Sequence, residues 1–99
     1  MSLNVRSERL DVNTTSRQIA KSRMASNPRT LIQIRNSSPN ATDIITLNFG
    51  RDKATSLEGV ILRQNDVMTD VISEGYIPWQ EQINAVCSTI NGKISVMER

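Results

Sequence analysis

The side chains best suited to chemistry lie around residues 74–81, where carboxylates stand next to aromatic rings. Glu74 and Glu81 flank the run GYIPW, which contains Tyr76 and Trp79. A carboxylate beside an aromatic face is an arrangement that binds sugars, but Tyr and Trp are also frequent anchors of subunit contacts. A packed corner of the domain or a subunit contact is the simpler interpretation of these rings. We predict that Tyr76 and Trp79 contact a protein partner, and a carbohydrate-binding site is the alternative.

The composition argues against catalysis. The chain contains no His, so the imidazole base of the usual Ser, Cys and metal-assisted hydrolytic sites is missing. Cys87 is the single cysteine, which excludes a disulfide within the chain and leaves too few ligands for structural zinc. Asp66 and Asp70 would form a paired carboxylate site only on a helix. We expect a protein that is not an enzyme and that holds no cofactor and no metal.

Cationic side chains are concentrated near the N-terminus. Residues 1–29 carry six Lys or Arg and two acids, whereas residues 30–99 carry six Lys or Arg and eight acids. Spaced cations in a polar segment neutralise either an acidic protein surface or nucleic-acid phosphates. Residues 1–28 have no aromatic ring for base stacking, which favours a protein partner over nucleic acid. We predict an extended basic arm over residues 1–28 that docks through Arg6, Arg9, Arg17 and Arg23.

Residues 29–99 are predicted to form one β-sandwich domain, because short apolar runs alternate with polar or Gly/Pro-containing breaks. The alternation in residues 42–49 is typical of a strand with one buried side. Asn91-Gly92 favours a type I′ turn that joins residues 83–90 to 93–98 as a hairpin. The expected core consists of Ile32, Ile34, Ile45, Leu47, Phe49, Ile61, Ile94 and Val96.

Two regions fit more than one element. Within the arm, residues 10–12 and 18–20 fit short strands that add to an edge of the domain or of a neighbouring subunit, while residues 15–25 also fit a short helix. Helical spacing of apolar residues within 66–90 competes with strands. We favour strands there because Gly75 and Pro78 interrupt the region and β-branched residues are frequent.

The size of the chain favours self-association. If the arm lies outside the core, about 70 residues must hold the fold, and domains of that size often gain stability from oligomerisation. The chain has only three aromatic residues to fill a core. It also lacks the roughly 20 consecutive apolar residues that a membrane-spanning helix needs. We therefore expect a protein that associates with itself and has no membrane partner.

Residues 27–98 carry a series of short motifs. The series begins with NPRTLIQIRN (27–36), an N-P-R segment followed by an apolar strand, and continues through GYIP (75–78). It ends with INAVCS (83–88) and a final ISVME strand (94–98). This order resembles that of small virion proteins of tailed and tailless bacteriophages, which begin with an N-P-x-R segment and an apolar strand. The arm is more basic than the Thr/Val-rich leader of those proteins.

This resemblance implies an all-β, small jelly-roll-like β-sandwich with an extended basic N-terminal arm. It also implies a homo-oligomeric subunit, trimer or pentamer, that binds a major capsid protein or another virion protein. Such a subunit would serve as a cement, decoration, vertex or spike-base protein in a virion assembled in the host cytoplasm. The competing hypotheses are a nucleic-acid-binding module that uses the basic arm and a carbohydrate-binding β-sandwich that uses Tyr76 and Trp79.

Overall fold

A computed structural model describes residues 6–50 and 53–99 of the chain. These residues form strands and no helix, which confirms the all-β expectation. The helices considered within residues 15–25 and 66–90 are absent from the described ranges. The strands are β1 (Arg6–Val12), β2 (Arg17–Ala20), β3 (Leu31–Asn36), β4 (Ile45–Phe49), β5 (Val60–Leu62), β6 (Val67–Val71), β7 (Ile83–Cys87) and β8 (Gly92–Glu98).

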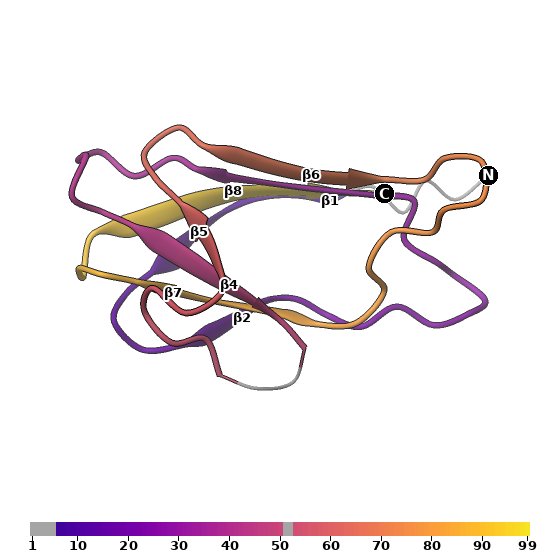
Figure 1. Ribbon diagram of the computed structural model, residues 1–99, viewed down its shortest axis with the longest axis horizontal. Helices are drawn as coiled ribbons and strands as arrows, with labels where there is room; N and C mark the ends of the chain where they lie inside the picture. The colour runs from indigo at the N-terminus through magenta and orange to yellow at the C-terminus, as the bar shows by residue number, and fades with distance from the viewer. Residues whose placement is uncertain (1–5, 51–52) are drawn as a thin grey trace.

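The strands build two four-stranded antiparallel sheets that face each other as a small sandwich (Figure 1). The first sheet has the order β1-β8-β3-β6, and the second has the order β2-β7-β4-β5. Every connection between consecutive strands except β4–β5 therefore crosses from one sheet to the other. This wrapping brings residues that are far apart in sequence into neighbouring strands.

The core lies between the sheets. Burial alternates along β8 but not along β7, where all five residues are buried. In β8, every second residue from Gly92 to Glu98 points inward, which is the period of a strand with one buried side. Six of the eight predicted core residues are buried: Ile32, Ile34, Ile45, Leu47, Ile94 and Val96.

Two predicted core residues lie nearer the surface. Phe49 is only partly buried against the core, and Ile61 is 37% exposed. The register of β5 explains the second difference, because Leu62 stands opposite Ile45 and so takes the inward position. The three-residue apolar run of β5 does not by itself show which of its side chains faces the core.

The predicted division at residue 28 is wrong for the described part of the arm. β1 pairs with β8 and β2 pairs with β7, so each is an edge strand of one sheet. Val12, Ile19 and Ala20 are buried in the core. The few apolar residues of this segment fill the space between the sheets, which confirms the alternative of two short strands added to the edges. Residues 6–20 are thus part of the sandwich and not a separate extended arm.

The predicted hairpin around Asn91-Gly92 is also wrong. β7 pairs with β2 and β4, whereas β8 pairs with β1 and β3, so the connection passes from the second sheet to the first. Gly92 is needed for another reason. A Cβ atom at this position would lie 2.5 Å from the Val12 carbonyl oxygen and 2.6 Å from the Cys87 sulfur. The glycine allows the chain to cross closely over β1 and the buried thiol.

Candidate functional site

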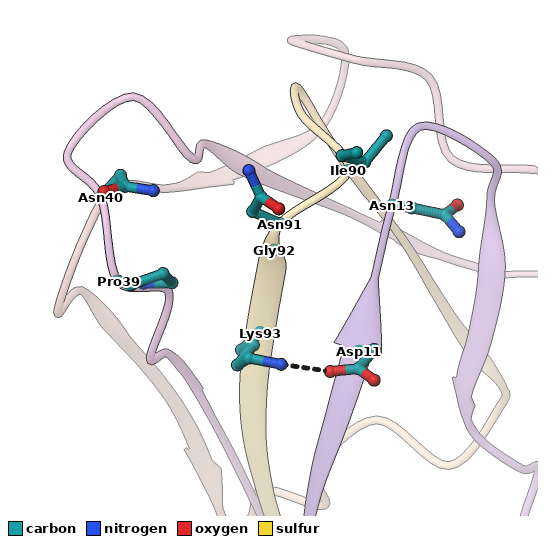
Figure 2. A pocket seen from close by; sticks show the side chains of 8 residues that line it. All are labelled: Asp11, Asn13, Pro39, Asn40, Ile90, Asn91, Gly92 and Lys93. Carbon is teal, nitrogen blue, oxygen red and sulfur yellow. Dashed lines mark hydrogen bonds and ion pairs between the residues drawn. The ribbon is translucent and has the colours of Figure 1, made fainter.

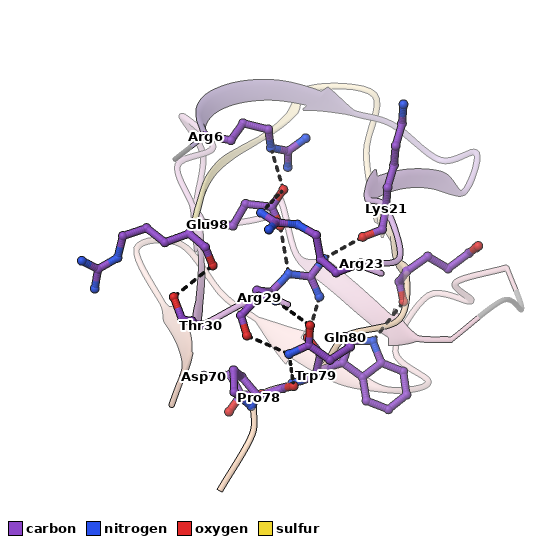
Figure 3. Close-up of polar contacts among 12 residues, drawn as sticks. Arg6, Lys21, Arg23, Arg29, Thr30, Asp70, Pro78, Trp79, Gln80 and Glu98 are labelled. Carbon is purple, nitrogen blue, oxygen red and sulfur yellow. Dashed lines mark hydrogen bonds and ion pairs between the residues drawn. The ribbon is translucent and has the colours of Figure 1, made fainter. Parts of the chain in front are cut away.

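Two of the predicted docking arginines are engaged within the molecule, as Figure 3 shows. Arg6 and Arg23 both approach the buried carboxylate of Glu98, at 3.2 and 3.7 Å from its Oε1 atom. The Arg6 Nε atom is close to that oxygen but is not aligned for a hydrogen bond, so this contact is an ion pair only. Arg6 also donates from Nη2 to the Ile19 carbonyl oxygen at 2.7 Å.

Arg29 completes this cluster and is fully buried. Its Nε atom donates to Glu98 Oε2 at 2.9 Å. Its two terminal nitrogens donate to the carbonyl oxygens of Trp79 and Lys21, at 2.6 and 2.7 Å. One guanidinium thereby joins the segment after β2, the segment before β7 and the end of β8. This arrangement satisfies the buried charges and is structural.

The sequence contains a signal for this cluster that the prediction of a basic docking arm does not use. Glu98 has the same strand parity as Ile94 and Val96, which are both predicted to be buried. An acid on the inward face of a strand needs a buried cationic partner. Arg29 precedes β3, the strand that pairs with β8, and is therefore well placed to be that partner. The sequence prediction counts Arg29 among the N-terminal cations and places it at the start of the domain, without a partner.

The two remaining arginines are exposed. Arg9 lies on β1, and its position alternates with the inward-facing Leu10 and Val12, which places it on the outer face of the first sheet. Arg17 lies on β2 and donates from Nη1 to the Asp11 carbonyl oxygen at 2.8 Å. The predicted set of four arginines is therefore split into an internal pair and a surface pair.

Tyr76 and Trp79 occupy the loop between β6 and β7, and Asp70 of β6 holds both of them. The Tyr76 hydroxyl donates to one Asp70 carboxylate oxygen, and the Trp79 backbone N–H donates to the other at 2.9 Å. The hydrogen bond to the carboxylate raises the pKa of Tyr76. Trp79 packs edge-to-face on Phe49 with ring centroids 5.7 Å apart. Trp79 is thus largely a packing residue, while Tyr76 is 47% exposed.

Apolar side chains are exposed along β6 and in the loop that follows it. We call this the apolar edge, and it consists of Val67, Val71, Ile72, Tyr76 and Ile77. These side chains are between 46% and 68% exposed. β6 is also an outermost strand of the first sheet. Exposed apolar residues on an edge strand are a feature of association surfaces.

A polar cavity of about 610 Å³ lies at the end of the sandwich opposite the Tyr76 loop (Figures 1 and 2). Its walls come from the connections β1–β2, β3–β4 and β7–β8. Lys93 Nζ lies 2.6 Å from Asp11 Oδ1 across its floor. The hydrogen bond and the charge of Lys93 lower the pKa of Asp11, and Arg17 adds to this effect. Tyr76 and Trp79 are not part of this cavity.

No family model, curated protein or solved structure matches the chain. The resemblance to small virion proteins therefore stays a prediction. Within residues 6–50 and 53–99, no three His, Cys, Asp or Glu side chains are grouped in a way that would hold a metal ion. The same residues contain no helix that is long and apolar enough to cross a membrane.

Proposed function

We propose that this protein is a non-enzymatic, self-associating structural subunit of a bacteriophage virion. The observation that carries the proposal is the apolar edge on β6, where five large side chains are exposed on and beside an outermost strand. Leaving such a surface in water invites association, and a closed assembly removes it. A symmetric shell built from many copies is one kind of assembly that covers such a surface.

The strand order supports a jelly roll as the fold of this subunit. A jelly roll has eight strands in two sheets built from two Greek keys, and it is an architecture used by viral capsid domains. The first sheet has the order β1-β8-β3-β6 and the second has the order β2-β7-β4-β5. At each position of these two orders stand two strands that are consecutive in sequence: β1 and β2, β8 and β7, β3 and β4, and β6 and β5. The motif order over residues 27–98 favours the same architecture.

The charge arrangement favours a protein partner over nucleic acid. Nucleic-acid binding needs several cations free to meet phosphates. Arg6, Arg23 and Arg29 are directed at Glu98 instead. Arg9 and Arg17 are the exposed cations of the two edge strands, and we assign them to docking on an acidic protein surface.

Light scattering on the purified full chain tests this proposal. We expect a discrete trimer or pentamer at low salt that persists at high salt, because burial of apolar side chains is not screened by ions. A chain that stays monomeric, and that gains mass only when DNA is added at low salt, would overturn the proposal in favour of a nucleic-acid-binding module.

A further inference from the structure

The backbone of β6 has a free row of hydrogen-bonding groups. Ile72 N donates to Thr30 O at 2.8 Å, and Asn36 N donates to Asp66 O at 3.0 Å, so these bonds bracket the β3–β6 ladder. In an antiparallel ladder, alternate residues bond to the same neighbour. The even-numbered residues of β6 therefore face β3. The N–H and C=O groups of Val67, Thr69 and Val71 point away from the sheet.

The same reasoning applies to β1 at the opposite edge. Leu31 and Arg99 exchange backbone hydrogen bonds at 3.0 and 3.2 Å, so the odd-numbered residues of β8 bond to β3 and the even-numbered residues bond to β1. The groups of Ser7, Arg9 and Asp11 then point outward. The hydrogen bond from the Arg17 side chain to the Asp11 carbonyl oxygen agrees with this assignment, because that oxygen points away from β8. No other strand of the described residues pairs with either edge.

The β6 edge is acidic, whereas the β1 edge carries both signs. Residues 64–82, which include β6 and the loop after it, contain four acids (Asp66, Asp70, Glu74 and Glu81) and no Lys or Arg. On and beside β1, Arg6 and Arg23 are directed at Glu98, which leaves the cations Arg9, Arg17 and Lys21 exposed next to the acids Glu8 and Asp11. Two copies that met through their β6 edges would bring acids together, whereas β6 against β1 brings acids toward cations. Charge therefore favours a contact between β6 of one copy and β1 of another.

We propose that β6 of one copy pairs with β1 of the next copy, so that the first sheet continues from subunit to subunit. This inference rests on the proposed self-association and specifies its interface. The direction fits, because β1, β8, β3 and β6 alternate and β6 is antiparallel to β1. The outward side chains of both strands would then share one face, where Ser7, Arg9 and Asp11 of the next copy lie beside Val67 and Val71. Such a head-to-tail contact closes a ring or grows a filament.

Proline substitutions at the outward-facing backbone groups test this pairing. The N–H groups of Thr69 and Arg9 face away from the sheet, so Thr69→Pro and Arg9→Pro remove groups offered to another copy. They also remove the Thr69 hydroxyl, which accepts from Gln33 Nε2, and the Arg9 cation, so Thr69→Ala and Arg9→Ala, which keep the N–H groups, are the matched controls. We expect each variant alone to be monomeric by light scattering. Mixed at equal concentrations, they are expected to form a 1:1 heterodimer, because each still offers one intact edge.

The outcomes separate this inference from the proposed function. An oligomer that both proline variants leave unchanged overturns the β6–β1 pairing while the structural role stands. Dimers of Arg9→Pro alone indicate pairing between two β6 edges and also overturn it. A wild-type chain that is monomeric at every concentration overturns both. If a proline variant loses the wild-type circular dichroism spectrum, Thr69→Lys and Arg9→Glu, which keep the N–H groups, replace the pair. Each is expected to be monomeric alone, and the mixture is expected to form an oligomer of alternating copies, because the cation added to β6 and the acid added to β1 attract each other.

Discussion

Arg29 and Glu98 form a buried ion pair across 69 positions of sequence, with Arg29 Nε 2.9 Å from Glu98 Oε2. Arg29 is fully buried, and Glu98 is 6% exposed. The pair fixes the segment after β2 against the last strand. The guanidinium groups of Arg6 and Arg23 lie beside the same Glu98 carboxylate and add positive charge there. It explains why basic residues near the N-terminus belong to the folded domain.

Loss of Arg29 should destabilise the fold strongly. Arg29→Ala leaves Glu98 buried with weaker compensation, and removing one partner of a buried pair costs about 3–5 kcal/mol of unfolding free energy. Urea denaturation measures this change. Arg35→Ala is the matched control, because Arg35 is exposed and its loss should change the unfolding free energy by no more than about 0.5 kcal/mol. Equal effects of the two variants would contradict the structural role of Arg29.

A charge placed on the apolar edge should weaken self-association without unfolding the subunit. Val71→Lys adds a cation to β6, and Val60→Lys makes the same change on β5 of the second sheet. The two side chains are 46% and 41% exposed, so the pair is closely matched. We expect Val71→Lys to raise the dissociation constant of the oligomer at least tenfold in analytical ultracentrifugation. Val60→Lys should leave it within about twofold, and the reverse order would place the interface on β5.

Trp79 should contribute more to folding than to association. Its ring packs on Phe49 and against the core, so Trp79→Ala removes a partly buried aromatic side chain. We expect a loss of about 2–3 kcal/mol in unfolding free energy, somewhat less than for a fully buried aromatic residue. Tyr76→Ala should change the unfolding free energy by less than half as much, because its side chain is 47% exposed. If thermal unfolding ranks the two variants in the opposite order, the packing role of Trp79 is wrong.

The Asp11–Lys93 pair predicts a pH-dependent contribution to stability. The folded pKa of Asp11 lies below its ordinary value of 3.8 because Lys93 binds the carboxylate. The contribution is therefore complete above pH 3.8 and is lost as the pH falls through the lowered folded pKa. Asp11→Asn should be slightly less stable than wild type at pH 7, and the difference should vanish at low pH. A difference that grows on acidification, in urea titrations, would contradict this sign.

The strands and most of the core followed from local pattern, because alternation in β8 reports one buried face directly. In β4 the alternation identified Ile45 and Leu47, but Thr46 between them is buried as well. Ile45, Leu47, Ile94 and Val96 were predicted on that basis and are buried. Pairing between distant strands has no such local signal. The Asn91-Gly92 dipeptide matched a hairpin turn, yet Gly92 is required by the close approach of Val12 and Cys87.

The predicted site residues were separated by contacts that residue type alone did not show. Arg6 and Arg9 have the same chemistry and lie on one strand, but the parity of β1 turns Arg6 toward Glu98 and Arg9 to the surface. Trp79 and Tyr76 lie three residues apart, and it is Trp79 that packs on Phe49 and against the core, while Tyr76 stays exposed. The inward parity of Glu98 was the one feature of the sequence that pointed to this cluster.

Backbone amide exchange tests the pairing of free edges most directly. In a monomer, the N–H groups of Val67, Thr69 and Val71 face away from the sheet and should exchange rapidly with deuterium. We predict that these amides, together with those of Ser7 and Arg9, become protected as the protein concentration rises through the range in which the oligomer forms. If they exchange at the monomer rate in a sample that is fully oligomeric, the subunits do not associate through β6 and β1.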